Sequence, residues 1–354
     1  MLDIIDRVLK HLGGISGKES TKIVFTDKQY TSIPLSIENF HPIADANKNN
    51  KSKILFVDGG NNTLLQSSNF IVSFVRLYAC LYDGNRKLKE EKHEFFAVVT
   101  TEYLDDSDKG RKLQFKTQLV PVGHALMPYV DDLSFDSMDS SLTEGVNRAS
   151  ISKVIDCVRR FGELNLAAKM SYNLKKDDVV ILDGILQATF TNEERYLDLL
   201  YKVCDEKNIK VCGLAKTSRL FTDAGDNALV VLDKMNRKNK ALSKWYYHPF
   251  VQINNNRHKA EMYIVKFHLD SDYVFRFEVH DGNKHETKEL FSLISDLSND
   301  PVFLGYPYGM IEADRNARVS NEEKNYLKTI FDTKMNLNAY LKSLDAHSVL
   351  DTIG

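Results

Sequence analysis

The sequence contains few of the residues and patterns that mark specialised classes of protein. Among 354 residues there are only 7 Pro, 17 Gly and 4 Cys, which excludes collagen-like repeats, Pro-rich linkers and disulfide-rich scaffolds. No apolar run approaches the roughly 18 to 20 residues of a membrane helix. Asp3 and Asp6 interrupt the apolar N-terminus, which argues against a signal peptide. We therefore expect a soluble, cytoplasmic protein without membrane contact.

The cysteines and the overall charge give no sign of a zinc site or of a strongly basic protein. The four cysteines are far apart, with no CxxC pair and no Cys/His cluster, so we expect reduced thiols: Cys80, Cys157, Cys204 and Cys212. Lys and Arg number 47 against 49 Asp and Glu, which gives a net charge of −2. Any contact with nucleic acid must therefore come from a local basic patch.

The length of the chain allows two domains or one large domain with insertions, and the order of its elements favours one main α/β domain between terminal helices. Apolar residues from Leu2 to Leu12 recur at helical spacing before Gly13-Gly14, so residues 1–50 are expected to be an N-terminal helix and a connection. Residues 51–330 are expected to form the main domain, with insertions near 105–145 and 234–285. Residues 331–354 are expected to be a C-terminal helix.

Two short apolar runs have the composition of buried strands, and each is followed by Asp-Gly. The run at 54–57 precedes Asp58-Gly59-Gly60, and the run at 179–182 precedes Asp183-Gly184. A continuous apolar tetrad between polar residues is typical of a strand that is buried on both faces, although four residues alone do not exclude a helix. We predict that both strands end at their Asp.

The segments around these two strands predict a mixed order of elements. Residues 70–82 and 94–103 are rich in β-branched and aromatic residues, which predicts a three-stranded antiparallel meander together with the first strand. Apolar residues at spacings of three and four predict a helix at 151–167 that carries Glu163 near its apolar edge. Thr191 with Glu194 and Ser320 with Glu323 predict capping boxes. Residues 209–214 are expected to form a strand parallel to 179–182.

This order of elements matches the ribonuclease H-like architecture, a mixed sheet flanked by helices. In that architecture the first and fourth strands lie side by side, so the carboxylates of Asp58 and Asp183 converge. Glu163 and an acid from 312–314 would complete a cage for two divalent cations about 3.5 to 4 Å apart. Hard oxygen ligands suit Mg²⁺ or Mn²⁺. Ordinary alternatives stay open for each acid alone, because Asp-Gly is common in turns and Glu is commonly exposed.

Five stretches in this order resemble the NurA family of prokaryotic nucleases. They are ILFVDGG at 54–60, RRFGELNLA at 159–167, VVILDGIL at 179–186, GLAKTSRL at 213–220 and GYPYGMIEADRNARVS at 305–320. The resemblance implies a metal-dependent exonuclease that acts on DNA ends with two Mn²⁺ or Mg²⁺ ions. It also implies a homodimer that works with a hexameric HerA-type translocase ATPase, in DNA end resection or in defence against invading DNA.

The resemblance implies that five residues are catalytic: Asp58, Glu163, Asp183, Asp314 and Tyr306. The four acids would be metal ligands, and Asp314 stands where members of the family have His or Asp. One ion would activate water and the other would stabilise the leaving 3′ oxygen. Members of the family often carry Ser after the first Asp-Gly, where this chain has Gly60, and we expect that difference to be tolerated.

Basic residues near these motifs and in one separate patch are predicted to bind DNA. Lys216 and Arg219 follow the strand at 209–214, and Arg315 and Arg318 lie in the last motif, so all four are candidates for phosphate contacts. Residues 234–259 carry seven Lys or Arg and no acid, interleaved with aromatic residues, which suits a nucleic-acid strand. The predicted contacts there are Arg237, Lys238, Lys240, Lys244 and Trp245. A solvated hairpin or an oligomer contact is the alternative.

Two other functions stay open at this point. An actin-like or sugar-kinase ATPase shares the superfold, but it needs a second Gly-rich phosphate loop, and Gly-Gly occurs only at 13–14 and 59–60. A catalytically silent partner subunit of a translocase, docked through the N-terminal helix, would have at least one ligand acid out of place.

Overall fold

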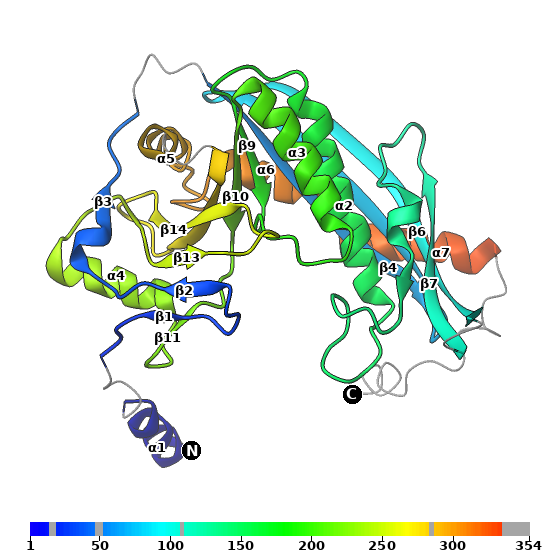
Figure 1. Ribbon diagram of the computed structural model, residues 1–354, viewed down its shortest axis with the longest axis horizontal. Helices are drawn as coiled ribbons and strands as arrows, with labels where there is room; N and C mark the ends of the chain where they lie inside the picture. Colours follow the sequence, from blue (N-terminus) through cyan, green and yellow to red (C-terminus); the bar gives the residue numbers. More distant parts are fainter. Residues whose placement is uncertain (14–18, 47–51, 107–109, 283–286, 335–354) are drawn as a thin grey trace.

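The computed structural model describes residues 1–13, 19–46, 52–106, 110–282 and 287–334. Parts of the connection expected within residues 1–50, at 14–18 and 47–50, lie outside these residues, as does all of the expected C-terminal helix beyond 334. Within the described residues, one eleven-stranded mixed sheet forms the centre of the molecule. Helices cover both of its faces (Figure 1), which confirms the predicted α/β fold class.

The main sheet has the strand order β3-β12-β14-β15-β10-β9-β4-β5-β6-β7-β8. Its strands are β3 (Phe40–Pro42), β4 (Lys53–Gln66), β5 (Phe70–Asp83), β6 (Arg86–Asp106), β7 (Gly110–Pro121), β8 (Phe135–Asp136), β9 (Val179–Asp183), β10 (Lys210–Ala215), β12 (Trp245–Tyr247), β14 (Ala260–Lys266) and β15 (Phe275–His280). Two small sheets pair β1 (Ile23–Val24) with β11 (Phe221–Thr222) and β2 (Tyr30–Ser32) with β13 (Val251–Ile253).

The helices are distributed along the whole chain. They are α1 (Leu2–Gly13), α2 (Ser152–Ser171), α3 (Glu193–Lys207), α4 (Ala228–Asn239), α5 (Thr287–Asp296), α6 (Tyr308–Ala317) and α7 (Asn321–Lys334), with the 3₁₀ helices η1 (Ile37–Asn39) and η2 (Val130–Leu133). The segment 105–145 holds the end of β6, then β7, η2 and β8. The segment 234–285 supplies β12, β14 and β15 to the main sheet itself.

The two apolar tetrads lie side by side in the middle of the sheet. β4 and β9 pair in parallel, with Phe56 opposite Ile181 and Val57 opposite Leu182. β9 also pairs in parallel with β10. The predicted adjacency of these strands is therefore confirmed.

The prediction that the first strand ends at Asp58 is wrong. β4 continues to Gln66 and pairs with β5 along its length, with one irregularity between Thr63 and Leu65. β6 and β7 continue the antiparallel pairing, so the meander has four long strands instead of three. The glycines after Asp58 therefore lie inside a strand. Glycine within a strand often marks a site where a neighbouring group approaches the backbone closely.

Of the predicted capping box at 320–323, the N-cap half forms, whereas the Glu323 carboxylate pairs with Arg76 instead of the Ser320 backbone. The backbone N–H of Glu323 donates to Ser320 Oγ at 3.1 Å, ahead of α7. The other prediction is wrong, because α3 begins at Glu193 and its N-cap is Asn192, in the left-handed region. The Glu193 carboxylate instead accepts from the backbone N–H of Thr189 at 2.8 Å, and it is buried.

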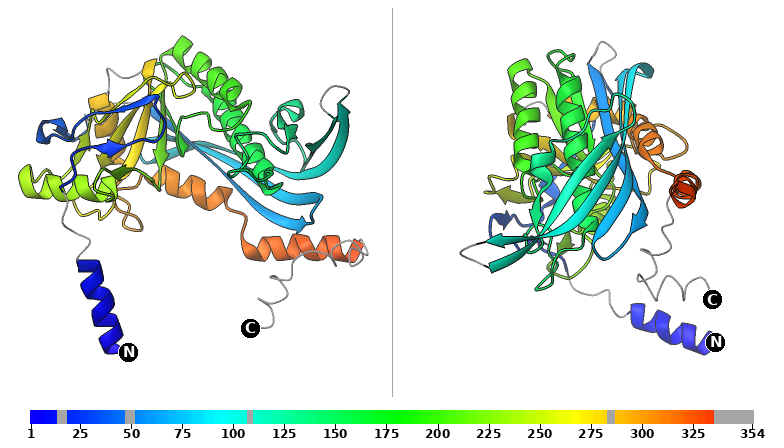
Figure 2. Two further views of the ribbon diagram at one scale, coloured as in Figure 1. Left: turned by 60° about the horizontal axis from the view of Figure 1, so that its bottom comes forward. Right: turned by 90° about the vertical axis from the view of Figure 1, so that its right-hand side faces the viewer.

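Two helical layers enclose the sheet (Figures 1 and 2). Leu55 and Val57 of β4 pack in the core with α2 and α3, whereas Ile54 and Phe56 pack in the core with α5 and α6. This division follows from the alternation of side chains along a strand. α6 lies very close to β4, because a Cβ on Gly309 would be 2.2 Å from the ring of Phe56.

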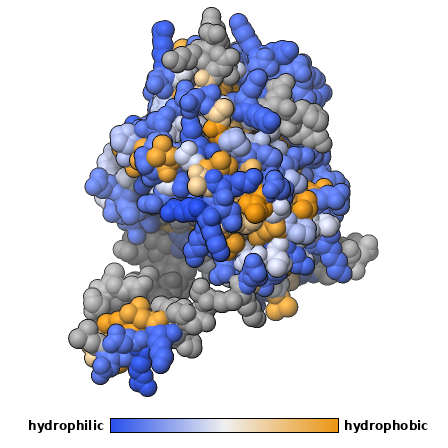
Figure 3. All heavy atoms as spheres, turned by 90° about the vertical axis from the view of Figure 1, so that its left-hand side faces the viewer, coloured by the Kyte–Doolittle hydropathy of each residue, from blue (hydrophilic) through white to orange (hydrophobic). Residues whose placement is uncertain are grey.

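The N-terminal helix α1 has one apolar side, as its spacing predicts. Ile4, Ile5, Val8 and Leu9 are between 47% and 58% exposed, and Figure 3 shows apolar atoms gathered along one side of this helix. No helix within the described ranges is both long enough and apolar enough to span a bilayer.

Replacing Gly309 by Ala should destabilise the protein by about 1 to 3 kcal/mol, because the added methyl group overlaps the Phe56 ring. The intrinsic helix preference runs the other way, since Ala is favoured over Gly by about 1 kcal/mol in a helix. The free energy of unfolding in urea measures the change. In a double-mutant cycle, Phe56→Leu should relieve part of the loss, and purely additive effects would contradict the close packing.

Candidate active site

Three strands direct polar side chains to the face of the sheet that α6 covers. Ile181 and Leu214 belong to the core on that face, as does Phe56. Because side chains alternate along a strand, the residue two positions further points to the same face. Those residues are Asp58 on β4, Asp183 on β9 and Lys216 just after β10.

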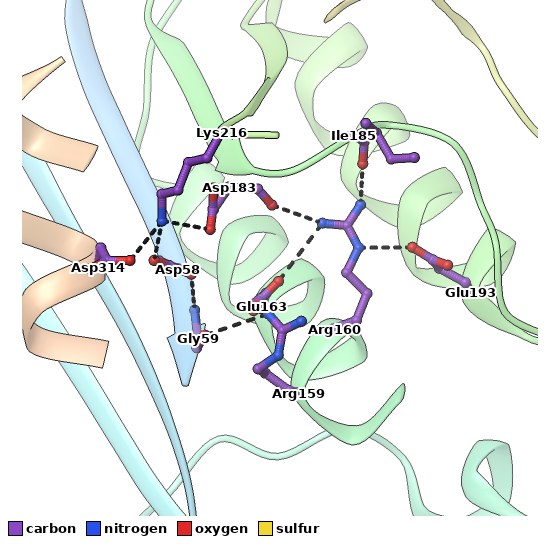
Figure 4. Close-up of polar contacts among 10 residues, drawn as sticks. All are labelled: Asp58, Gly59, Arg159, Arg160, Glu163, Asp183, Ile185, Glu193, Lys216 and Asp314. Atoms are coloured by element: carbon purple, nitrogen blue, oxygen red, sulfur yellow. Dashed lines mark hydrogen bonds and ion pairs between the residues drawn. The ribbon is translucent and has the colours of Figure 1, made fainter. Parts of the chain in front are cut away.

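The ammonium of Lys216 lies between three carboxylates (Figure 4). Its Nζ is 2.7 Å from Asp314 Oδ1, 3.0 Å from Asp183 Oδ2 and 3.8 Å from Asp58 Oδ2. Asp58 is buried, and its Oδ1 also accepts from the backbone N–H of Gly59 at 2.7 Å. Three acids that are far apart in the sequence therefore converge on a single positive charge.

The acid that α6 contributes is Asp314. Arg318, one turn further, donates to Asp314 Oδ2 at 2.9 Å. Glu312, the other acid of this segment, points elsewhere, because its carboxylate accepts from Tyr78 at 2.8 Å and from Lys87 at 2.9 Å. The structure thus brings Asp314, and not Glu312, to the other predicted acids.

Glu163 lies on the opposite side of β4, beside Gly59 (Figure 4). The carboxylate occupies the space of a missing side chain, since a Cβ on Gly59 would be 2.6 Å from Glu163 Oε1. Arg159 donates to the same oxygen, and Arg160 lies 3.8 Å from Oε2. Glu163 is 2% exposed, so its charge is balanced within the protein by two arginines.

Arg160 also holds the loop that follows Asp183. Its Nε donates to Glu193 at 2.8 Å, and its Nη2 donates to the carbonyl of Ile185 at 2.5 Å. Neither Arg159 nor Arg160 was predicted to take part in the site. Their positions four and three residues before Glu163, on the same helical face, were the available signal.

Tyr306 is almost completely buried, and its hydroxyl has no hydrogen-bond partner among the described residues. Its ring stacks on Phe303 with centroids 5.0 Å apart. Burial raises the pKa of the phenol, and the negative charges of Asp183, Asp58 and Asp314 raise it further. A buried hydroxyl without a partner among the described residues is typical of a group that binds a ligand or an ordered water.

Burial and mutual repulsion control the protonation of the cluster. Burial, followed by the charges of Asp183 and Glu163, raises the pKa of Asp58 to about 8. Burial lowers the pKa of Lys216, but the attraction of Asp183 and Asp58 outweighs it and raises that pKa to about 12. Burial acts to raise the pKa of Asp314, and the hydrogen bond from Lys216 lowers it overall.

The donors in this cluster are of the kind that divalent cations bind. Carboxylate oxygens are the preferred ligands of Mg²⁺ and Mn²⁺. The contacts to Lys216, at 2.7 to 3.8 Å, are longer than the roughly 2.0 to 2.6 Å of bonds to hard cations. Accordingly, no group of three or more acids, His or Cys in the described part of the chain has the arrangement of a metal site. The residues fit a cation in type, and holding one requires that Lys216 leave and the oxygens close in.

A cavity of about 170 Å³ opens beside this cluster. It is lined by Asp58, Gly59, Gly60, Asn61, Asp183, Asp314, Arg318 and Val319. Of the residues predicted to bind DNA, Lys216 and Arg318 therefore lie at the acids, and Arg219 and Arg315 are exposed residues on the neighbouring segments.

The basic segment 234–259 is separate from the acid cluster in its contacts. Arg237 pairs with Asp233, Lys240 with Glu38 and Lys244 with Asp45, and Lys238 is exposed. Trp245 is completely buried in a core with Phe40 and Tyr247. The prediction that Trp245 offers a stacking face to DNA is therefore wrong, because its ring is buried and packs edge-on against Phe40 of the adjacent strand β3.

Glycine at position 60 fits this chain for a steric reason. A Cβ there would be 2.3 Å from the carbonyl oxygen of Ala317, at the end of α6. A Ser at position 60 would force the end of this helix away from β4. Gly60 therefore leaves room for the end of α6 against β4 in this chain.

Comparisons with known proteins identify relatives of this chain. The NurA domain family model matches residues 52–319. The fold is similar to the NurA nuclease from Sulfolobus solfataricus, with 14% identity, coverage of 97% of each chain and a TM-score of 0.51. A more remote likeness is Endonuclease V from Ciona intestinalis in complex with a 24mer DNA, with 13% identity, coverage of 81% of this chain and 92% of that chain, and a TM-score of 0.36. No curated protein has a sequence that matches this chain.

The raised pKa of Asp58 predicts how the stability of the metal-free protein changes with pH. Because the folded protein keeps this proton up to about pH 8, against 3.8 for an unperturbed Asp, the folded state binds more protons in this window and loses stability as the pH rises. Asp58→Asn should remove this contribution.

Thermal unfolding in EDTA from pH 5 to pH 8 measures the effect. Relative to Asp58→Asn, the wild type should lose at least about 1 kcal/mol across this range. The exposed Asp198 is the control position, and Asp198→Asn should follow the wild type. Parallel profiles for wild type and Asp58→Asn would contradict the raised pKa.

Proposed function

Because the chain belongs to the NurA family of nucleases, we propose that it is a divalent-metal-dependent deoxyribonuclease that hydrolyses phosphodiester bonds as an exonuclease at DNA ends. The observation that carries this proposal is the convergence of Asp58, Asp183 and Asp314 on one cationic group. Carboxylates that converge from separate elements repel one another and so do not stabilise the fold by themselves. Such a cluster is therefore typical of a functional site.

In this proposal the three aspartates hold two Mn²⁺ or Mg²⁺ ions. Bound ions of this kind lower the pKa of water and stabilise a leaving oxygen. Glu163 is the fourth acid that would hold them, and its carboxylate lies beside Gly59 in contact with Arg159. Its burial between Arg159 and Arg160 keeps the carboxylate in place.

The groups around the cavity suit a phosphodiester. Arg318 is 71% exposed at the cavity wall, and its guanidinium is able to bind a phosphate with two hydrogen bonds. The hydroxyl of Tyr306 is a donor without a partner in the described protein. The exposed Arg219 and Arg315 are proposed as further contacts for DNA. The basic segment 234–259 offers the exposed Arg237, Lys238 and Lys240 and the partly buried Lys244 as additional contacts for the strand.

The proposed partners are DNA, a second copy of the chain and a hexameric HerA-type translocase ATPase. The exposed apolar side of α1 is a surface of the kind that protein contacts cover. DNA end resection and defence against invading DNA are the two proposed pathways, because both need an enzyme that degrades from ends.

The arrangement of the acids favours this function over a silent partner subunit, which would have a displaced ligand acid. Asp58, Asp183 and Asp314 all contact one atom, and α6 keeps Asp314 near by packing closely on β4. An actin-like ATPase is disfavoured by the sequence, which offers no second Gly-rich phosphate loop.

The activity test uses end-labelled linear DNA and a covalently closed circle, with Mn²⁺, Mg²⁺ or EDTA. The wild type should degrade linear DNA in the presence of metal, and Asp58→Asn and Asp183→Asn should each lose about 10²-fold or more of this activity. Asp198→Asn, on the surface of α3, is the matched control. If no variant and no metal gives cleavage, even with the cognate translocase and ATP, the proposal of a nuclease active site here fails.

Tyr306→Phe separates a contact with the substrate from a role in folding. The hydroxyl has no partner in the described protein, so its removal should leave the free energy of unfolding unchanged or raise it by up to about 1 kcal/mol. Cleavage of linear DNA should fall about tenfold if the hydroxyl binds the phosphate or its water. Full activity in Tyr306→Phe would exclude this role for the tyrosine.

A further inference from the structure

We propose that Lys216 is an internal counter-ion of the active site, which occupies the place of the divalent cation in the metal-free protein and must be displaced before metal binds. This inference rests on the proposed metal site and adds a competitor to it. The competitor and the cation would share the same three carboxylates.

The position of the ammonium carries the inference. Nζ contacts Asp58, Asp183 and Asp314, which come from β4, β9 and α6 respectively. Among the described residues, the ion pairs of Asp58 and Asp183 are with Lys216 alone. The close-up in Figure 4 shows the side chain reaching from its strand into the space between the acids. One ammonium that contacts three converging carboxylates therefore stands where a divalent ion would bind once the oxygens closed in.

The charges explain why such a group is needed. Three carboxylates in one partly buried cluster repel one another. Arg318 relieves only Asp314, so without Lys216 the two strand carboxylates would face each other with no positive charge between them. Lys216 therefore keeps the three side chains in a converged arrangement while no metal is bound.

The same contacts make the lysine replaceable. The Lys216 side chain is 33% exposed, and its ammonium group stands at the end of a flexible aliphatic stem. Lys266, in contrast, is only 7% exposed beside Asp233. A divalent ion carries twice the charge and approaches oxygen more closely than an ammonium does. The three acids that Lys216 contacts line the cavity, and so does Arg318. A phosphate there would pair with the released ammonium.

Competition for the same ligands predicts the direction and the size of the effect of removing the lysine. Partly exposed ion pairs are individually weak, and the three contacts of Lys216 must open when metal binds. Replacing Lys216 by the neutral Met should therefore lower the Kd for Mn²⁺ about tenfold. Lys216→Arg keeps the positive charge and should leave the Kd close to that of the wild type.

The test is isothermal titration of the metal-free full-length protein with Mn²⁺ alone, without DNA. Lys259 provides a matched control, because it is 38% exposed and pairs with two acids, Asp198 and Glu194, outside the site. Lys259→Met should bind Mn²⁺ as the wild type does. Melting curves in EDTA and in Mn²⁺ provide a second measurement, in which Lys216→Met should gain more stability from Mn²⁺ than the wild type gains.

The outcomes separate this inference from the proposed function. Tighter binding by Lys216→Met, or binding by this variant when the wild type binds too weakly to measure, supports the counter-ion role. Equal or weaker binding by Lys216→Met, with Mn²⁺ bound by the wild type, overturns that role and leaves the metal site standing. Absence of Mn²⁺ binding in the wild type and in a folded Lys216→Met overturns both. Unfolding of Lys216→Met in EDTA without rescue by Mn²⁺ also overturns the counter-ion role, because a displaceable group cannot be essential once metal is present.

Discussion

The parallel pairing of β4 with β9 is the constraint on which the site depends. It places Val57 opposite Leu182, so the acids that follow these two residues fall next to each other on the same face. The sequence separation of Asp58 and Asp183 is large, and only this pairing makes them neighbours. α6 then completes the cluster, because its close approach to β4 at Gly309 and Gly60 sets the distance of Asp314 from the strand.

The charges of the site are balanced separately on the two faces of the sheet. On the α6 face, Lys216 forms ion pairs with three aspartates. On the α2 face, Arg159 and Arg160 serve Glu163, and Arg160 is shared with Glu193. Glu163 nevertheless contributes to the raised pKa of Asp58, so the two groups are electrically coupled through the gap that Gly59 leaves. A change in the charge of Glu163 on one face therefore shifts the pKa of Asp58 on the other face.

The sequence was sufficient to predict the central strands, their adjacency and the convergence of Asp58 with Asp183, because these follow from local composition and from a fixed architecture. Apolar tetrads before Asp58 and Asp183 are short-range signals, and so are the periodicities of α1 and α2. Local composition does not distinguish Asp314 from Glu312, and only the resemblance to the NurA family singled out Asp314. The contact that turns Glu312 away comes from Tyr78 on a distant strand.

The burial of Trp245 could likewise not be predicted from the sequence. An aromatic residue beside several lysines has the same local pattern whether it stacks on a ligand or fills a core, and burial decides between them. The end of the first strand was misjudged for a related reason, since Asp-Gly is a common turn signal. Whether glycine bends a chain or makes room for a neighbour depends on Glu163 and Ala317, which lie more than a hundred residues further along.

The glycine pair after Asp58 has a consequence for how related chains can diverge. Gly59 leaves room for a carboxylate from α2, and Gly60 leaves room for the backbone at the end of α6. A larger residue at either position requires a compensating movement of a different helix, one on each face of the sheet. Substitutions at these two positions should therefore accumulate in step with changes in the packing of α2 or α6, and the two positions should drift independently of each other.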